Sequence, residues 1–227
     1  MSVVSQGLVI FDVDGTLVDS QFEIVTAMRA AFAAVERPPP DRARVLRVVG
    51  LSLPHAMTCL ASDANPATLE RMVEAYRDSY ADLRRRASST AAPLYPGMLA
   101  LLDHLDADGD IVLGIATGKS RRGLDALLDS LDLRHYFATV QCADDHPGKP
   151  HPSMMLSALS ETGMPAHRAV MVGDTVFDID MAIAARVASI GVTWGYHRRS
   201  DLERATMVVD EVESLAEAIP MALQGTP

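Results

Sequence analysis

The stretch Gly7-Leu8-Val9-Ile10-Phe11-Asp12-Val13-Asp14-Gly15-Thr16-Leu17 decides the fold of this 227-residue chain. Its first five residues are apolar and β-prone, which predicts a buried strand. Two carboxylates one residue apart follow the strand, and Gly15 then provides a turn. In an open α/β sheet, ligands bind beyond the carboxyl ends of the strands, so the two acids indicate a functional site. Because like charges repel, we expect a divalent metal, a lysine or a shared proton beside them.

The composition indicates one large domain, or a core with a smaller insertion. A hydrophobic content of 48% supports a sizeable core, and a formal charge of -10 argues against nucleic acid as a partner. Cys59 and Cys142 lack CxxC spacing and histidine partners, which predicts two buried thiols rather than a disulfide or a zinc site. Neither a signal-peptide pattern nor a membrane-spanning apolar run is found, so we expect no membrane partner and a cytoplasmic location. The sequence leaves the oligomeric state open.

The pattern along the chain predicts an α/β fold that is interrupted by helices. Residues 20–91 show helical periodicity only, including a helix that Asp41 caps and that runs through Val49. Beyond Gly97, helices alternate with strands, which predicts a doubly wound, mostly parallel, Rossmann-like sheet with a helical cap inserted after its first strand. The predicted later strands cover residues 111–116, 139–142, 169–172, 188–192 and 207–209. We expect a catalytic core of residues 1–19 and 92–227 and a cap of residues 20–91.

Four short motifs follow four of the predicted strands. They are Asp12-x-Asp14, Ala116-Thr117-Gly118-Lys119-Ser120, Gly148-Lys149-Pro150 and Gly173-Asp174-Thr175-Val176-Phe177-Asp178. Because the carboxyl ends of parallel strands meet at one edge of a sheet, we expect the motifs to lie together. They combine several carboxylates, a hydroxyl beside free backbone amides, and a lysine. This set suits phosphoryl transfer with a carboxylate nucleophile and an oxygen-ligated Mg²⁺.

The four motifs resemble those of the haloacid dehalogenase superfamily, on its phosphatase branch, and the resemblance covers essentially the whole chain. It implies that Asp12 attacks phosphorus and forms an aspartyl phosphate. It implies that Asp14 protonates the leaving oxygen and later activates water. Thr117 and Gly118 would bind the phosphoryl group, and Lys149 would neutralise it together with Asp12.

The resemblance also implies a Mg²⁺ site that Asp12 and Asp174 hold with their side chains and Asp14 with its backbone carbonyl. Asp178 either orders this site or ligates the metal directly. The expected partner is a small phosphorylated metabolite, since three segments look most like those of phosphoglycolate phosphatases: Leu94-Tyr95-Pro96-Gly97, Gly118-Lys119-Ser120 and Thr193-Trp194-Gly195-Tyr196. Within the cap, the loop Gly50-Leu51-Ser52, with Arg47, is the expected reader of the leaving group.

Several other functions are compatible with parts of this pattern. A P-loop is excluded because three residues, not four, separate Gly114 from the Gly118-Lys119 pair. A phosphomutase stays open, because it uses the same core residues and differs in whether water or a second hydroxyl takes the phosphoryl group. A metal-independent dehalogenase would not need the acidic set. A non-catalytic binding protein would be favoured by the loss of motif residues, and none of them is lost.

One departure from the family is that Ala184-Ala185-Arg186 ends a predicted helix without the usual glycine.

Overall fold

Six parallel strands form the centre of the structure, a computed structural model that describes residues 7–86 and 92–224. Their order in the sheet is β3-β2-β1-β4-β5-β6, so the first strand of the chain lies inside the sheet. The strands are β1 (Gly7–Phe11), β2 (Ile111–Thr117), β3 (Phe137–Cys142), β4 (Ala169–Gly173), β5 (Ala188–Val192) and β6 (Met207–Val209). The predicted parallel sheet is confirmed.

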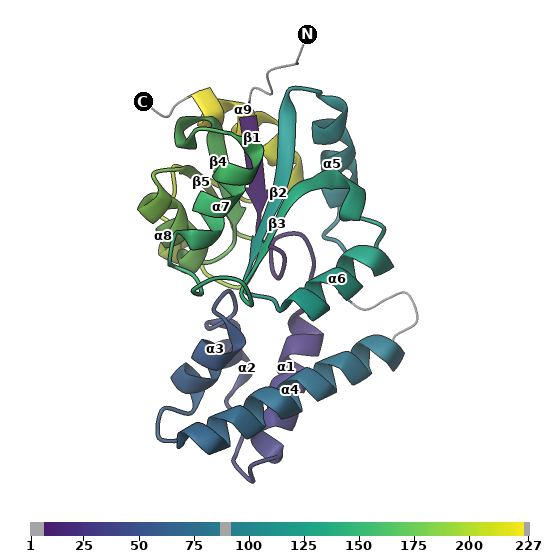
Figure 1. Cartoon of the computed structure of the whole chain (residues 1–227), viewed down its shortest axis with the longest axis vertical. Coiled ribbons are helices and arrows are strands. Elements are labelled where there is room, and N and C mark those ends of the chain that lie inside the picture. Colours follow the sequence, from purple (N-terminus) through teal and green to yellow (C-terminus); the bar gives the residue numbers. More distant parts are fainter. Residues whose placement is uncertain (1–6, 87–91, 225–227) are drawn as a thin grey trace.

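Helices cover both faces of this sheet, as expected for a doubly wound fold (Figure 1). Successive residues of β1 point to opposite faces: Val9 and Phe11 pack in one apolar cluster, and Leu8 and Ile10 pack in another. The first cluster includes α5 (Met98–Ala107), α6 (Arg121–Ser130) and α9 (Leu215–Gln224), and the second includes α7 (Ser153–Thr162) and α8 (Val176–Ala185). Single 3₁₀ turns lie at Arg134–Tyr136, Ala166–Arg168, Arg199–Asp201 and Val212–Ser214.

A helical cap is inserted between β1 and β2 and faces the carboxyl ends of the strands (Figure 1). Its helices are α1 (Gln21–Ala33), α2 (Arg42–Leu46), α3 (Leu53–Leu60) and α4 (Pro66–Arg86). They bury an apolar cluster of their own, with Met28, Met57 and Met72 at its centre. The two connections to the core run side by side, because Val18 bridges to Leu94 and the amide of Asp19 donates to the carbonyl of Pro93 at 2.9 Å. The end of the predicted cap, residues 87–91, lies outside the described residues.

The second cap helix is shorter than predicted. Asp41 caps it as expected, since its side chain accepts a hydrogen bond from the amide of Arg44. The helix ends at Leu46, however, and the amides of Val48 and Val49 bond three residues back in a tighter turn. Two adjacent β-branched residues have low helix propensity, which accounts for the early end. The turn brings the loop 50–52 toward the core.

One of the two cysteines differs from the prediction. Cys142 is buried as predicted, but Cys59 is exposed. Helix α3 buries the face that carries Ala56, Met57 and Leu60, and the thiol of Cys59 lies outside that face.

After α8, Arg186 itself takes the left-handed conformation (φ 58°) that a glycine usually supplies. The amide of Val187 then bonds to the carbonyl of Ala182 at 2.9 Å, so the turn closes without a glycine.

No helix in the described ranges is both long and apolar enough to cross a bilayer.

Candidate active site

The four sequence motifs meet at the carboxyl edge of the sheet, below the cap. Asp12 follows β1, Thr117 ends β2, Lys149 lies in the loop after β3, and Asp174 follows β4. Their side chains are all at most 1% exposed. Parallel strands in neighbouring register bring their ends to one place, which is the physical reason that motifs far apart in the sequence converge.

Lys149 is fully buried between two carboxylates. Its Nζ lies 2.9 Å from Oδ1 of Asp12 and donates to Oδ1 of Asp178 at 2.6 Å. Burial opposes the positive charge, but the two acids together outweigh it and raise the pKa of Lys149. The lysine therefore stays charged and is held beside Asp12, where a dianionic phosphoryl group would need a cation.

The surroundings of Asp12, the predicted nucleophile, shift its pKa strongly. Burial raises its pKa to about 7; Lys149 acts in the opposite direction, and Asp178 and Asp14 add to the rise. Although Lys149 is close, neither Asp12 oxygen accepts a hydrogen bond from the described residues. A buried carboxylate with open lone pairs is costly unless a ligand or an ion completes it.

The acidic cluster fits a divalent metal ion. Asp12, Asp174 and Asp178 each offer an oxygen, and these oxygens all lie within 4.8 Å of one another. Burial and the two neighbouring acids raise the pKa of Asp174 well above its usual value, so a cation beside Asp174 would favour its charged form. Oxygen donors of this kind, together with the unpartnered oxygens of Asp12, are what Mg²⁺ prefers.

Asp174 is held in place by the first motif. One of its oxygens accepts from the hydroxyl of Thr16 at 3.0 Å and the other from the amide of Tyr196 at 2.8 Å. Gly15 has φ +89°, and a Cβ there would lie 2.3 Å from Asp174 Oδ2. The glycine of the first motif is thus needed both for the turn and for the space that Asp174 occupies.

Asp178 has partners on both oxygens. Oδ1 accepts from Lys149, and Oδ2 accepts from the amide and the hydroxyl of Thr175 at 3.0 and 2.7 Å. These contacts form a capping box at the start of α8. They favour the expectation that Asp178 orders the site through Lys149.

The side chain of Asp14 is not part of the cluster of three acids. It accepts from the hydroxyl of Ser20 at 2.5 Å and from Nζ of Lys119 at 2.9 Å. Lys119 also donates to the hydroxyl of Tyr80 on cap helix α4 at 3.0 Å, and its Nζ lies 4.8 Å from that ring's centroid. Burial opposes the charge on Lys119, but Asp14 and Tyr80 outweigh it and raise the pKa of the lysine. Asp14 is therefore tied to the cap through one buried lysine.

Lys119 was not predicted from the sequence to have a role in the site of its own. Its only sequence signal is its place in the second motif, two residues after Thr117. The amide of Lys119 donates to the hydroxyl oxygen of Thr117 at 3.3 Å, which leaves the Thr117 proton available toward the cavity. Ser120 caps α6, since its side chain accepts from the amide of Gly123.

The cap loop 50–52 touches the core beside Thr117. A Cβ on Gly118 would lie 2.5 Å from the carbonyl oxygen of Gly50, so the two backbones can meet only at a glycine. A Cβ on Gly148 would lie 3.2 Å from the Ser52 side chain. The loop therefore lies against two of the motifs, and its role as the reader of the leaving group stays a prediction.

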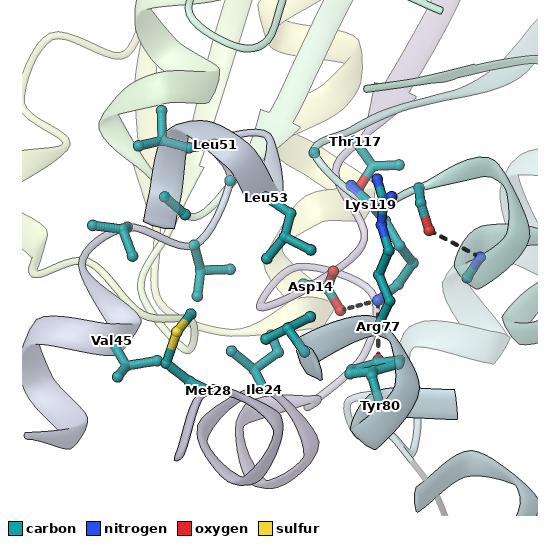
Figure 2. A pocket seen from close by; sticks show the side chains of 18 of the residues that line it. Asp14, Ile24, Met28, Val45, Leu51, Leu53, Arg77, Tyr80, Thr117 and Lys119 are labelled. Atoms are coloured by element: carbon teal, nitrogen blue, oxygen red, sulfur yellow. Dashed lines mark hydrogen bonds and ion pairs between the residues drawn. The ribbon is translucent and has the colours of Figure 1, made fainter. Parts of the chain in front are cut away.

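A cavity of about 110 Å³ lies between the cap and the motifs, bordered by Asp12, Asp14, Thr117 and Gly118. In Figure 2, Thr117, Lys119, Arg77 and Tyr80 gather on one side and apolar cap residues on the other. The apolar wall comes from α1, α2, α3 and the loops between them, and includes Ile24, Met28, Val45, Val49, Leu51 and Leu53. Such a wall excludes water from the carboxylates. Arg47 is not part of the lining, whereas Arg77 of α4, which sequence analysis did not single out, is.

Comparison with known proteins agrees with this geometry. The family model described as haloacid dehalogenase-like hydrolase matches residues 9–192. The chain is 39% identical to probable phosphatase IndB of Dickeya dadantii, over 97% of each chain. It is 31% identical to the phosphoglycolate phosphatase of Agrobacterium fabrum, over 93% of this chain and 91% of that one. A solved hydrolase from Pseudomonas syringae superposes with a TM-score of 0.83 at 27% identity, over 95% and 98% of the two chains.

The match of the family model spans all four motifs and the cap between them. The chain therefore belongs to the haloacid dehalogenase-like hydrolases, on their phosphatase branch.

Proposed function

We propose that this protein is a Mg²⁺-dependent phosphatase that hydrolyses a small phosphate monoester through an aspartyl-phosphate intermediate. The observation that carries this proposal is the buried Asp12 carboxylate, which pairs with Lys149 at 2.9 Å and has no other partner among the described residues. A nucleophile needs open lone pairs aimed at the substrate, and a neighbouring cation holds the phosphoryl oxygens.

In the first step, an Asp12 oxygen attacks phosphorus and the bond from phosphorus to the ester oxygen breaks. Asp14 gives its proton to the leaving oxygen. In the second step, Asp14 takes a proton from water, the water oxygen attacks phosphorus, and the bond to Asp12 breaks. Lys149, the Thr117 hydroxyl and the Gly118 amide hold the phosphoryl oxygens through both steps.

Asp12 and Asp174 would hold the metal with their side chains, and Asp14 with its backbone carbonyl. When bound, Mg²⁺ supplies positive charge against the phosphoryl oxygens and the acidic cluster. Asp178 keeps Lys149 in position.

A phosphoglycolate-like ester is the proposed substrate class. The phosphoglycolate phosphatase similar to this chain supports it. The proposed division of labour is that residues 1–19 and 92–227 perform the chemistry, whereas the cap of residues 20–91 selects the leaving group.

The test is release of inorganic phosphate from a panel of small esters with Mg²⁺, and with a chelator in its place. The wild type should release phosphate with Mg²⁺ and none in the chelator, and Asp12→Asn should release none in either condition. The matched control Asp63→Asn changes an exposed cap aspartate and should retain activity. If the protein instead releases halide from a 2-haloacid, and keeps full activity in the chelator, the dehalogenase is supported. Formation of an isomeric sugar phosphate without net phosphate release would support the phosphomutase.

A further inference from the structure

A second and larger cavity lies beside the proposed catalytic one. It has a volume of about 740 Å³ and is lined mainly by α4 of the cap and α6 of the core. Arg77, Tyr80, Ser120 and Gly123 line both cavities, so the two cavities adjoin at these side chains. Figure 2 places Arg77 and Tyr80 beside Thr117 and Lys119, on the side of the inner cavity opposite Met28 and Val45.

This outer cleft is basic, although the chain carries a formal charge of -10. Its lining has four arginines, Arg77, Arg84, Arg85 and Arg122, and among the described lining residues the only acid is Asp144. Clustering of one sign of charge in a cleft of an oppositely charged protein attracts ligands of the other sign. The cleft therefore fits an anion.

Two of the arginines have donors to spare. Arg84 is engaged with the carbonyl of Ala126 and the hydroxyl of Ser130, and Arg85 pairs with Asp82. In the described part of the chain, by contrast, neither Arg77 nor Arg122 forms a hydrogen bond or an ion pair. Guanidinium groups hold carboxylates and phosphates through two parallel hydrogen bonds, so these two side chains are suited to bind such an anion.

The inner cavity alone is too small for an extended substrate. Ligand sites for larger molecules have volumes of roughly 300–1,000 Å³, a range that includes the outer cleft but not the inner cavity. With the phosphoryl group at Asp12, carbon atoms beyond the ester oxygen would pass the apolar cap wall and leave at Arg77. What lies beyond that point meets Arg122.

We propose that the leaving group of the substrate carries a second anion, a carboxylate or a phosphate, which Arg77 and Arg122 bind in the cleft between α4 and α6. This inference rests on the proposed phosphatase function. Within the phosphoglycolate-like class, it favours phosphate monoesters that are longer than phosphoglycolate itself and anionic at both ends.

The test compares matched six-carbon esters. Glucose 6-phosphate has a neutral leaving group, 6-phosphogluconate adds a distant carboxylate, and glucose 1,6-bisphosphate adds a distant phosphate; 2-phosphoglycolate is the short reference. In the wild type, kcat/KM for at least one long dianionic ester should exceed that for glucose 6-phosphate and for 2-phosphoglycolate by about tenfold or more. Whichever long ester is preferred identifies the second anion as carboxylate or phosphate.

The double variant Arg77→Met/Arg122→Met should bring the ratio to glucose 6-phosphate down to about one. The control Arg29→Met removes one arginine charge from an exposed position on α1 that lines neither cavity, and should leave the ratio unchanged. Equal wild-type values for all the esters, or an equal loss of the ratio in the control, would overturn the proposal.

Binding separates this proposal from the proposed function. The same compounds can be titrated calorimetrically into the Asp12→Asn protein with Mg²⁺, where no turnover is needed. If the wild type releases no phosphate from any ester, the proposed function fails, yet tighter binding of a long dianion that the double variant loses would still support the cleft. Binding that the double variant does not weaken would refute it.

Discussion

The substitution Asp12→Asn should stabilise the metal-free protein at pH 8, although it removes the proposed nucleophile. Burial is the main cause that raises the pKa of Asp12 from 3.8 to about 7, even with Lys149 beside it. A shift of that size corresponds to about 4 kcal/mol in favour of the neutral side chain. Asparagine is nearly isosteric and neutral, and Lys149 keeps its contact with Asp178. We expect the variant to gain up to about 4 kcal/mol, or a rise of roughly 10 °C in Tm for a chain of this length.

The gain should depend on pH in a defined direction. Between pH 3.8 and about 7, folded Asp12 keeps a proton that the unfolded chain releases, so wild-type stability falls as pH rises and levels off above 7. At pH 5 the advantage of the variant should therefore shrink to about 2 kcal/mol. Asp174 contributes to the slope in both proteins.

Thermal unfolding in EDTA at pH 5 and pH 8 measures both quantities. Added Mg²⁺ should then raise the Tm of the wild type more than that of the variant, because ligand binding stabilises by about 2.7 kcal/mol at a hundred times Kd. An asparagine variant that melts at or below the wild type at pH 8 without metal would refute the reasoning, and so would an advantage that is equal at the two pH values.

The remaining predictions concern the metal, the contact of the cap with the core, and the lysine that joins Asp14 to the cap. Asp174→Ala should raise the Mg²⁺ concentration needed for half-maximal activity at least tenfold, and a metal titration that matches the wild type would contradict it. Gly118→Ala should lower kcat/KM about tenfold or more, since its Cβ would lie 2.5 Å from a cap carbonyl, whereas Gly109→Ala, with nothing within 4 Å, serves as the unaffected control. Lys119→Met and Tyr80→Phe interrupt the same bridge, so a double-mutant cycle on kcat/KM should show a coupling of roughly 0.5–3 kcal/mol, and additive effects would exclude the bridge.

The sheet and the acidic cluster could be predicted because their signals are local. Each strand is a short apolar run, and each motif residue lies within a few positions of a strand end, so parallel topology alone brings Asp12, Thr117 and Asp174 together. Lys149, in the loop after β3, is buried against Asp12, as the order of the motifs implied. The roles of these residues remain proposals.

The contacts between cap and core could not be predicted in the same way. Tyr80 reaches Lys119 only because α4 crosses the carboxyl edge of the sheet, and no spacing in the sequence encodes that crossing. The same applies to Arg77, which lies on an exposed helix position that periodicity alone assigns to solvent. Arg47, by contrast, was expected to read the leaving group with the loop 50–52, but it is not among the residues that line the cavity.

The place of β1 in the sheet has a consequence for synthesis of the chain. Leu8 pairs in register with Val112 on one side and with Ala169 on the other, so β1 leaves the ribosome well before both of the strands that flank it. The cap helices emerge before either partner and can already bury their own apolar cluster. The second edge of β1 stays open until Val172 has been added, because it pairs with Phe11. The nascent chain therefore exposes an edge of this apolar strand until β4 has been made, and an unpaired strand edge is prone to aggregate in that period.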